Sequence, residues 1–347
     1  MNLLFRTDAS LTMGTGHVMR CIALAQTAQD AGGRAAFALA ESTAGIRAKL
    51  AEESCDVVPI SAEAGTELDS EQCITLARQQ RADWIITDGY QFGDNYQRAL
   101  KAAGFKVLFL DDYGHAAHYS ADLVLNQNAQ ATESLYAVRE PYSRLLLGTE
   151  YCLLRREFGP WRSWKREIAP VGSKVLVTMG GSDPDNVTES VITALQLLPD
   201  VEATIVIGGS NPHCDSLQRL ASQGGQRFRL LQSVANMPEL MAWADVAVSG
   251  AGSTCWEMCL LQLPMLLIDL ADNQKPIAGA LIRLGAAIHL GAGGDVTADQ
   301  IAERVRNLLA AGTDRASLSK RCGQLVDGRG AERVLGELSR GEENGLR

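Results

Sequence analysis

The stretch NLLFRTDASLTMGTGHVMRCIALA, residues 2–25, predicts a strand, a glycine turn and a helix in direct succession. The run at 2–8 is short and continuously apolar at its centre, as in a buried strand. The helix that follows carries apolar residues on one face: Val18, Cys21, Ile22 and Ala25. His17 stands at the start of this helix, directly after Gly14-Thr15-Gly16. A strand that turns sharply into a helix is the building unit of parallel α/β sheets.

The same alternation continues on both sides of residue 150. Strand-like runs in the first half are LLFR (3–6), AAFALA (35–40), DVVPI (56–60), WIITD (84–88), VLFLDD (107–112) and LVLN (123–126). Those in the second half are KVLVTMG (174–180), ATIVIG (203–208), FRLL (228–231), VAVSG (246–250), MLLIDL (265–270) and AIHL (287–290). Short apolar strands that alternate with helices predict parallel sheets covered on both faces.

The segment at 151–172, YCLLRREFGPWRSWKREIAPVG, breaks this alternation with charge, tryptophan and proline. We therefore expect an α/β fold of two Rossmann-like domains, 1–154 and 173–340, joined by a linker at 155–172. A polar tail follows at 341–347. Ligands of parallel sheets bind at the carboxyl ends of the strands, so a cleft between the two domains is the expected site.

Composition narrows the class of partner. The chain of 347 residues has a net charge of -9 and no basic run, which argues against nucleic acid. It has no signal-like N-terminus and no run of the roughly 18 apolar residues that a membrane span needs. None of the eight cysteines forms a C-x-x-C pair. We expect a cytoplasmic protein with reduced thiols, monomeric or weakly homo-oligomeric, that does not bind membranes.

The glycine turn before His17 matches no cofactor motif. A dinucleotide fingerprint requires glycine or alanine at position 19, where this chain has Met19, and no Gly-Lys-Ser/Thr follows for a Walker loop. The positive end of the helix dipole disfavours imidazolium, so His17 suits the role of a neutral base. The alternative is a histidine that only caps or packs the turn.

Further polar clusters follow predicted strands. In VSGAGSTCWEMCLLQLP (248–264), Gly250 and Gly252 form a turn, and the free amides of the next helix can bind an anion. Glu257 falls one turn into that helix, where it suits the two hydroxyls of a ribose or, alternatively, solvent.

Two more loops offer ligand groups. In MGGSDPDN (179–186), Gly180 and Gly181 permit close backbone approach, and Asp183-Pro184 predicts a helix N-cap with proline at the first position. The alternative is a turn without ligand. In LADNQKP (270–276), Asn273 and Gln274 suit sugar hydroxyls or acetamido groups.

A metal site is not expected. Asp111, Asp112, His115 and His118 lie near one strand end, but H-x-x-H in a loop is a weak ligand pattern. His213 and His289 are expected to be structural.

Six segments in this order resemble one family of sugar-nucleotide hydrolases. They are FRTDASLTMGTGHVMRCIALA, ITDGY, FLDDY, LVLNQN, MGGSDPDN and SGAGSTCWE, and they span nearly the whole chain. The family is PseG, the UDP-2,4-diacetamido-2,4,6-trideoxy-β-L-altropyranose hydrolases of pseudaminic acid biosynthesis. The second half, with MPELMAWADVAVSGAGSTCWE followed by LPMLLIDL, also resembles the nucleotide-binding half of MurG transferases. Both families imply the glycosyltransferase-B architecture.

The resemblance implies a role for each matching position. His17 would activate water, Glu257 would hold the ribose of UDP, and the backbone at Ser253 and Thr254 would cradle the diphosphate. Backbone groups around Val234 would contact uracil. The sugar would be contacted by Asn273, Gln274 and Tyr90. The remaining implied substrate-binding positions are Arg6, Asp8, Gly14, Gly16, Gly180, Gly181 and Gly252. Ala9 departs from the family's usual serine and is given no role.

The implied reaction is the inverting, metal-independent hydrolysis of a UDP-sugar, and it needs no cofactor. The C-terminal domain would bind UDP, and the N-terminal domain would carry the base. Because UDP already leaves readily, one base suffices where glycosidases use two carboxylates. Two alternatives stay open: a MurG-like UDP-sugar glycosyltransferase, and a sugar-nucleotide-binding subunit without activity. The sequence assigns no direct role to Asp88, Asp111 or Asp112.

Overall fold

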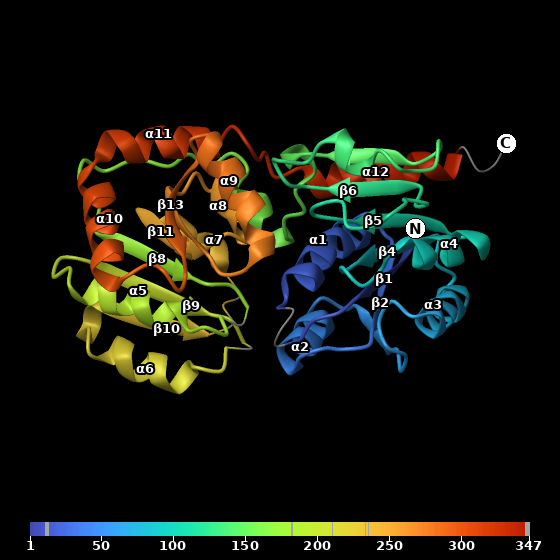
Figure 1. The fold of residues 1–347 in the computed structure, drawn as a ribbon, viewed down its shortest axis with the longest axis horizontal. Helices are drawn as coiled ribbons and strands as arrows, with labels where there is room; N and C mark the ends of the chain where they lie inside the picture. The colour runs from blue at the N-terminus through green and yellow to red at the C-terminus, as the bar shows by residue number, and fades with distance from the viewer. Residues whose placement is uncertain (11–13, 182, 210, 233, 235, 344–347) are drawn as a thin grey trace. The chain divides into compact units, whose positions relative to one another are not determined.

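The computed structural model describes residues 1–10, 14–181, 183–209, 211–232, 234 and 236–343. These residues form two compact units (Figure 1). The N-terminal unit comprises residues 1–156 and 328–347, and the C-terminal unit comprises residues 157–327. Within the described part of the chain, no helix has the length and apolar character required to cross a membrane.

The N-terminal unit is built around a parallel sheet, and the segments that connect its strands run across the two faces of the sheet. In the described residues it has seven strands in the order β3-β2-β1-β4-β5-β6-β7. Their bounds are β1 (Asn2–Thr7), β2 (Arg34–Leu39), β3 (Asp56–Pro59), β4 (Trp84–Asp88), β5 (Lys106–Leu110), β6 (Leu123–Asn126) and β7 (Arg144–Leu147). Because β4 neighbours β1, Thr7 pairs with Asp88, and the carboxyl ends of these two strands share one edge.

Alternate residues of these strands fill two cores. Leu3 and Phe5 of β1 pack on one face, and Leu4 packs on the other. The first face is covered by α1 (Gly16–Asp30) and α2 (Ala44–Glu52), and the second by α3 (Glu67–Gln79) and α4 (Asp94–Ala102). Because helices cover both faces, the neighbouring strands β1 and β4 are buried at almost every consecutive position.

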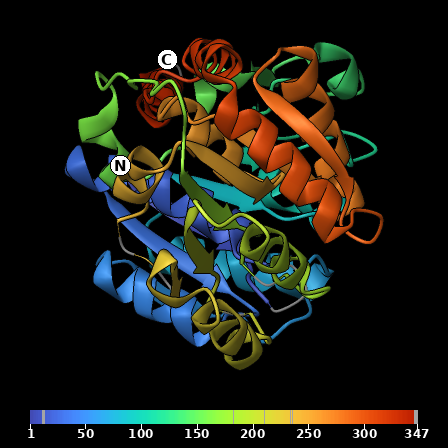
Figure 2. The same cartoon turned by 90° about the vertical axis from the view of Figure 1, so that its left-hand side faces the viewer.

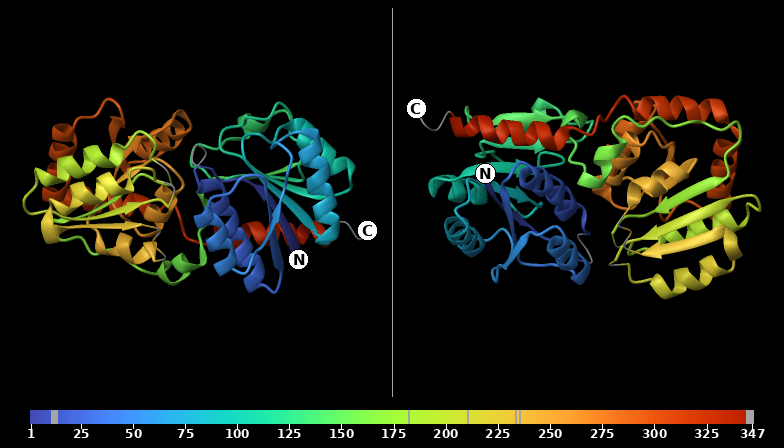
Figure 3. Two further views of the ribbon diagram at one scale, coloured as in Figure 1. Left: turned by 90° about the horizontal axis from the view of Figure 1, so that it is seen from below. Right: turned by 180° about the vertical axis from the view of Figure 1, so that it is seen from behind.

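The last helix corrects the predicted domain boundary. The sequence predicts a C-terminal domain that runs to residue 340, but α12 (Gly330–Glu343) belongs to the N-terminal unit. Its Ala331, Val334 and Leu338 are buried in the same core as α1, and Figure 3 shows the red helix alongside this unit. An amphipathic helix carries no mark of which sheet will cover its apolar face, so the strand pattern could not assign it. Residues 344–347 of the predicted tail lie outside the described part.

The C-terminal unit has the same design. Its described residues form a six-stranded parallel sheet in the order β10-β9-β8-β11-β12-β13. The strands are β8 (Lys174–Thr178), β9 (Glu202–Ile207), β10 (Phe228–Gln232), β11 (Val246–Gly250), β12 (Met265–Asp269) and β13 (Ala287–Ala292). Helices lie on both faces of this sheet (Figure 2). They are α5 (Val187–Gln196), α6 (Cys214–Ser222), α7 (Met237–Trp243), α8 (Thr254–Leu260), α9 (Lys275–Arg283), α10 (Ala298–Ala310) and α11 (Gly312–Cys322).

Short 3-10 turns complete the two units: η1 (Glu133–Tyr136), η2 (Thr149–Tyr151), η3 (Arg156–Trp161), η4 (Gly225–Arg227) and η5 (Asp272–Gln274). The predicted linker begins with η3 and otherwise has little regular structure. Strand β7 was missing from the predicted set, because RLLL is an edge strand within a polar, proline-containing stretch. Seven of the eight cysteines are buried, and Cys214 is half-buried.

Candidate functional site

The glycine turn places His17 at the start of α1, as the sequence predicts. Helix α1 begins at Gly16 with Thr15 as its N-cap. Gly14 has a φ of +79°, a left-handed conformation that glycine adopts without strain, and its N–H donates to the carbonyl of Ser10. His17 therefore lies just beyond the carboxyl end of β1 and is 8% exposed.

The His17 ring contacts a carboxylate from the neighbouring strand. Its Nδ1 lies 2.7 Å from Oδ1 of Asp88, the last residue of β4, which is fully buried. Arg20, one turn further along α1, donates to both oxygens of Asp88, from Nε to Oδ2 and from Nη2 to Oδ1, at 2.6 Å each. The thiol of Cys21 lies 3.5 Å from Oδ2. Three residues of α1 thus converge on one carboxylate.

Arg20 also binds a second carboxylate, Asp112, which follows β5. Its Nη1 donates to Oδ1 at 2.7 Å, and its Nη2 lies 3.2 Å from Oδ2. The Tyr90 hydroxyl donates to Oδ2 at 3.0 Å, and the side-chain amide of Asn128 donates to Oδ1 at 2.8 Å. The Arg20 guanidinium thereby links the carboxyl end of β4 to the loop after β5, and Asp112 in turn links that loop to Asn128, which follows β6.

This arrangement keeps both carboxylates ionised. Burial alone would raise the pKa of Asp88, but the charge of Arg20 and the hydrogen bonds from Arg20 and His17 hold it below its ordinary value. Burial opposes ionisation of Asp112 in the same way, and Arg20 nevertheless lowers the pKa of that carboxyl well below its usual range. The pKa of Arg20 is correspondingly raised, because its two ion pairs outweigh the cost of burial.

Aromatic rings cover this cluster. The Tyr90 ring meets the His17 ring edge to face, with centroids 5.0 Å apart. Tyr113 and His115 lie against Tyr90 at centroid distances of 5.1 and 5.7 Å. Tyr113 is 42% exposed, so the His17 cluster extends to the surface of the unit through tyrosine rings.

Arg6 and Asp8 were expected among the substrate-binding residues, and the structure places them in the interior instead. Arg6 is fully buried and donates to Asp69 and Asp8. Asp8 accepts the backbone N–H groups of Ala40 and Glu41 through its Oδ1. Arg6 has no exposed surface, and these bonds tie the ends of β1 and β2 to α3. A contact of either residue with substrate stays a prediction.

The acidic segment at 111–118 makes hydrogen bonds within its own loop. Oδ1 of Asp111 accepts the N–H groups of Asp112, Tyr113 and Gly114, and its Oδ2 accepts the hydroxyl of Tyr119 at 2.5 Å. His118 does not join these bonds: its Nε2 lies 3.7 Å from Oε1 of Glu140. Among the described residues, no group of three or more His, Cys, Asp or Glu side chains is arranged to hold a metal ion.

In the C-terminal unit, β11 turns through Ala251–Ser253 into α8, which has Ser253 as its N-cap without a side-chain capping bond. Glu257 lies in the first turn of α8 and is half-buried, at the position predicted for it. Gln274 crosses to this turn, because its Oε1 accepts the N–H groups of Ala251 and Leu270. The loops after β11 and β12 are therefore tied together, and neighbouring Asn273 is exposed.

The loop at 179–186 differs from its predicted form. Helix α5 begins at Val187 with Asn186 as N-cap, so Pro184 does not occupy its first position. Asp183 still caps the helix, accepting the N–H groups of Val187 and Thr188. Its side chain reaches them from further back because the chain takes left-handed turns at Asp183 and Asn186.

Gly180 has a φ of +82°, and a Cβ at Gly208 would lie 2.0 Å from the carbonyl oxygen of Gly181. Gly180 is thus favoured by its left-handed backbone conformation, and Gly208 by the close approach of the two loops. Val234 is half-buried, and its neighbours Ser233 and Ala235 lie outside the described residues.

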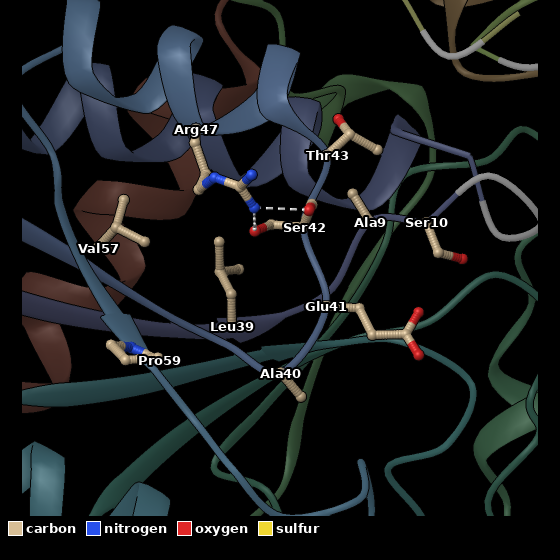
Figure 4. A pocket seen from close by; sticks show the side chains of 10 residues that line it. All are labelled: Ala9, Ser10, Leu39, Ala40, Glu41, Ser42, Thr43, Arg47, Val57 and Pro59. Carbon is tan, nitrogen blue, oxygen red and sulfur yellow. Dashed lines mark hydrogen bonds between the residues drawn. The ribbon is translucent and has the colours of Figure 1, made fainter.

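A separate pocket of about 920 Å³ lies at the carboxyl ends of β1, β2 and β3 (Figure 4). It is lined by Ala9, Ser10, Leu39, Ala40, Glu41, Ser42, Thr43, Arg47, Val57 and Pro59. Figure 4 shows Arg47 bonded to Ser42 across one side of it. None of the expected substrate residues lines this pocket.

Arg20 and Asn128 were missed by the sequence analysis, and Asp88 was given no role. Arg20 was detectable as a charge within an apolar helical run, one turn from His17 and on the same face. Asp88 required the strand order, because only the placement of β4 beside β1 brings it to His17. No pattern in the sequence distinguishes Asn128 from other polar residues that follow a strand.

Comparison with known proteins gives a consistent picture. Residues 175–327 match the model of the Glycosyltransferase family 28 C-terminal domain. The chain is 28% identical over 287 residues to the UDP-2,4-diacetamido-2,4,6-trideoxy-β-L-altropyranose hydrolase of Campylobacter jejuni, covering 82% of this chain and 97% of that protein. The resemblance found in the motifs is thereby confirmed.

Two other relatives are matched over less of their length. An uncharacterised protein of Methanocaldococcus jannaschii is 24% identical, over 84% of this chain and 60% of its own length. The spore coat polysaccharide biosynthesis protein SpsG of Bacillus subtilis is 28% identical, over 67% of this chain and 68% of its own. The chain thus spans less than two thirds of the first of these proteins and about two thirds of the second.

Solved structures confirm the glycosyltransferase-B architecture. MurG of Acinetobacter baumannii superposes with a TM-score of 0.66 at 15% identity, over 98% of this chain and 99% of that one. HepE of Anabaena, solved with UDP and glucose, gives a TM-score of 0.61 at 17% identity, with the same coverage. At this identity the likeness establishes the fold.

Proposed function

We propose that this chain, similar in sequence to a UDP-diacetamido-trideoxyhexose hydrolase and built on the glycosyltransferase-B architecture, hydrolyses a UDP-linked 2,4-diacetamido-2,4,6-trideoxyhexose to UDP and free sugar. The reaction belongs to nonulosonic (pseudaminic) acid biosynthesis. The observation that carries the proposal is His17, an imidazole at the ligand-binding edge of the N-terminal sheet, at a helix start. A base in this place suits activation of water.

The chemistry divides between the two units. His17 removes a proton from water as its oxygen attacks the anomeric carbon, and the bonding electrons of the C–O bond leave with UDP. Backbone amides at Gly252, Ser253 and Thr254 stabilise the charge that grows on the diphosphate, as helix N-termini do for anions. Attack opposite the leaving group inverts the anomeric centre, and no metal takes part.

Binding roles follow the same division. Glu257 accepts hydrogen bonds from the ribose hydroxyls, and backbone groups beside Val234 contact uracil. Asn273 and Tyr90 contact the sugar, together with Gln274. Because Oε1 of Gln274 already accepts two backbone N–H groups, its amide nitrogen is the group that donates to the sugar. Gly14, Gly16, Gly180 and Gly181 permit close backbone approach.

A second candidate function is a UDP-sugar glycosyltransferase, in which His17 deprotonates an acceptor hydroxyl. The match of residues 175–327 to a glycosyltransferase domain and the MurG-like fold favour it. The two candidates use the same nucleotide site and differ only in what attacks the anomeric carbon.

The test is UDP release from a panel of UDP-diacetamido-trideoxyhexoses and UDP-N-acetylglucosamine, without any acceptor, with the sugar product followed by NMR. We expect release of UDP and free sugar from a diacetamido member, at a rate that exhaustive chelation leaves unchanged. Release that appears only after an acceptor is added supports the transferase. Binding of UDP without turnover under either condition overturns both candidates.

A further inference from the structure

We infer that Asp88 is a positioning residue, which fixes the tautomer and orientation of the His17 imidazole so that Nε2 is the nitrogen that accepts the proton from water. The inference rests on the proposed function for its chemistry and on the geometry of the described residues for its structure. It also assigns a purpose to the buried Arg20–Asp112 pair, which holds Asp88 in place.

The first step is the assignment of the proton on Nδ1. That atom lies 2.7 Å from Asp88 Oδ1 and 3.2 Å from Arg20 Nη2. A guanidinium can only donate and a carboxylate can only accept, so Nδ1 cannot bond to both. The shorter contact to a carboxylate that Arg20 keeps ionised selects Nδ1–H donating to Asp88. Nε2 then carries the lone pair.

The second step concerns rigidity. Asp88 is fully buried and receives two hydrogen bonds of 2.6 Å from Arg20, which in turn is held by Asp112. Asp112 accepts from Asn128 and Tyr90 as well. The carboxylate that orients His17 is therefore fixed by groups from four elements or the loops that follow them, and Tyr90 also packs on the imidazole. An imidazole held from two sides keeps its Nε2 direction.

The third step is charge. Asp88 and Asp112 carry two negative charges and Arg20 carries one positive charge, so with neutral His17 the cluster has one excess negative charge. When Nε2 takes the proton from water, the imidazolium neutralises that excess, and Nδ1–H stays donated to Asp88. No proton moves to Asp88. The imidazolium that forms as water is deprotonated is thus stabilised by the ionised carboxylate beside it, as in other bases that an aspartate orients.

The experiment combines a spectroscopic and a kinetic measurement. In the intact wild-type chain, ¹⁵N NMR of His17 at alkaline pH, assigned by loss of its signals in His17→Gln, is expected to show Nδ1 protonated and Nε2 bare. In Asp88→Asn the amide can donate to Nδ1, so the tautomer is expected to reverse. Turnover of the diacetamido substrate should then fall by about 10²–10⁴-fold in kcat, with UDP affinity unchanged.

Glu140→Gln is the matched control, because Glu140 lies beside His118, a histidine outside the cluster. It should leave both the His17 tautomer and kcat at wild-type values. A wild-type His17 protonated on Nε2 overturns the inference without any Asp88 variant, which covers the case in which Asp88→Asn does not fold. A folded Asp88→Asn variant with wild-type kcat also overturns the inference. If the wild type itself releases no UDP from any sugar nucleotide, the proposed function fails, and the NMR result still decides the geometry.

Discussion

Arg6 and Asp69 form two hydrogen bonds in the interior of the N-terminal unit, Nε to Oδ1 at 2.8 Å and Nη2 to Oδ2 at 3.0 Å. Both side chains are fully buried, and Asp69 also accepts the N–H of Gly65. The pair joins strand β1, the third in the sheet order, to the start of α3. A planar guanidinium suits this role, because it satisfies both carboxylate oxygens at once.

Replacing Arg6 should therefore act on stability. Arg6→Met leaves Asp69 and Asp8 buried without their cation, which typically costs about 3–5 kcal/mol of unfolding free energy. Urea unfolding of the whole chain measures it. Arg98→Met is the control, since Arg98 pairs with Asp94 at an exposed site, and such pairs contribute about 0–1 kcal/mol. Unchanged unfolding together with a raised KM would return Arg6 to the substrate site.

The contrast between Arg6 and Arg20 shows where sequence reasoning stops. Both are charged residues in apolar runs near the same strand end, and the local pattern treats them alike. Their difference is topological: Arg6 points into the sheet interior toward α3, whereas Arg20 faces the edge that β1 and β4 share. Strand order sets such neighbours, and a single sequence gives strand order only through rules of thumb.

Local patterns succeeded where the signal is itself local. The alternation of apolar strands and helices correctly predicted the parallel sheets, and the glycine turn correctly predicted His17 at a helix start. The same patterns could not assign α12, because its partner α1 lies some 300 residues away in the chain. They also placed the start of α5 three residues early, because the capping side chain of Asp183 reaches forward along the chain, past the left-handed Asn186, to the N–H groups of Val187 and Thr188.

Removal of the His17 imidazole should suppress turnover. His17→Ala is expected to lower kcat by about 10²–10⁴-fold, the usual range for a lost general base. UDP affinity, measured by calorimetry, should stay unchanged because the nucleotide is assigned to the C-terminal unit. His118→Ala controls for loss of any histidine from this unit. Turnover close to wild type in His17→Ala would exclude the residue as the base.

Glu257 should affect binding more than chemistry. If it holds the ribose, Glu257→Ala raises KM and weakens UDP as an inhibitor while kcat changes little, the pattern of lost uniform binding. Steady-state kinetics and UDP inhibition give both quantities. Asp272→Ala, at an exposed site in the same unit, should change neither. A collapse of kcat at unchanged UDP affinity would instead assign Glu257 to the reaction.

Asp111 should contribute a stability that depends on pH. Burial would raise its pKa, but the contacts with His115 and Tyr119 and the N–H of Tyr113 hold the pKa below its ordinary value. A lowered pKa in the folded state stabilises the protein above the unfolded value of about 3.9, and this contribution is lost as pH falls through the folded pKa.

Asp111→Asn is therefore expected to lower the unfolding free energy by about 1.5–3 kcal/mol at pH 7, and the gap to wild type should narrow below about pH 4. Urea unfolding at a series of pH values tests this. The exposed Asp185, changed to Asn, should give no such pH-dependent gap. A gap that is constant with pH would mean that the carboxylate charge does not stabilise the loop.

The position of bond cleavage follows from which unit supplies the base. In the proposed division the C-terminal unit binds UDP and the N-terminal unit supplies His17, so the part of the substrate that needs the base is the sugar. Attack at phosphorus would require extra neutralisation of the phosphate oxygens, for which enzymes usually recruit metal ions. Attack at the anomeric carbon requires only the base and a stabilised leaving group, because positive charge develops on the sugar while negative charge leaves with UDP.

A single turnover in ¹⁸O-labelled water distinguishes attack at the anomeric carbon from attack at phosphorus. We expect the label in the anomeric hydroxyl of the sugar and none in UDP, by mass spectrometry of both products. Free sugar product incubated in labelled water corrects for exchange through the open-chain form. Label in UDP would place the attack at phosphorus and remove His17 from the role proposed here.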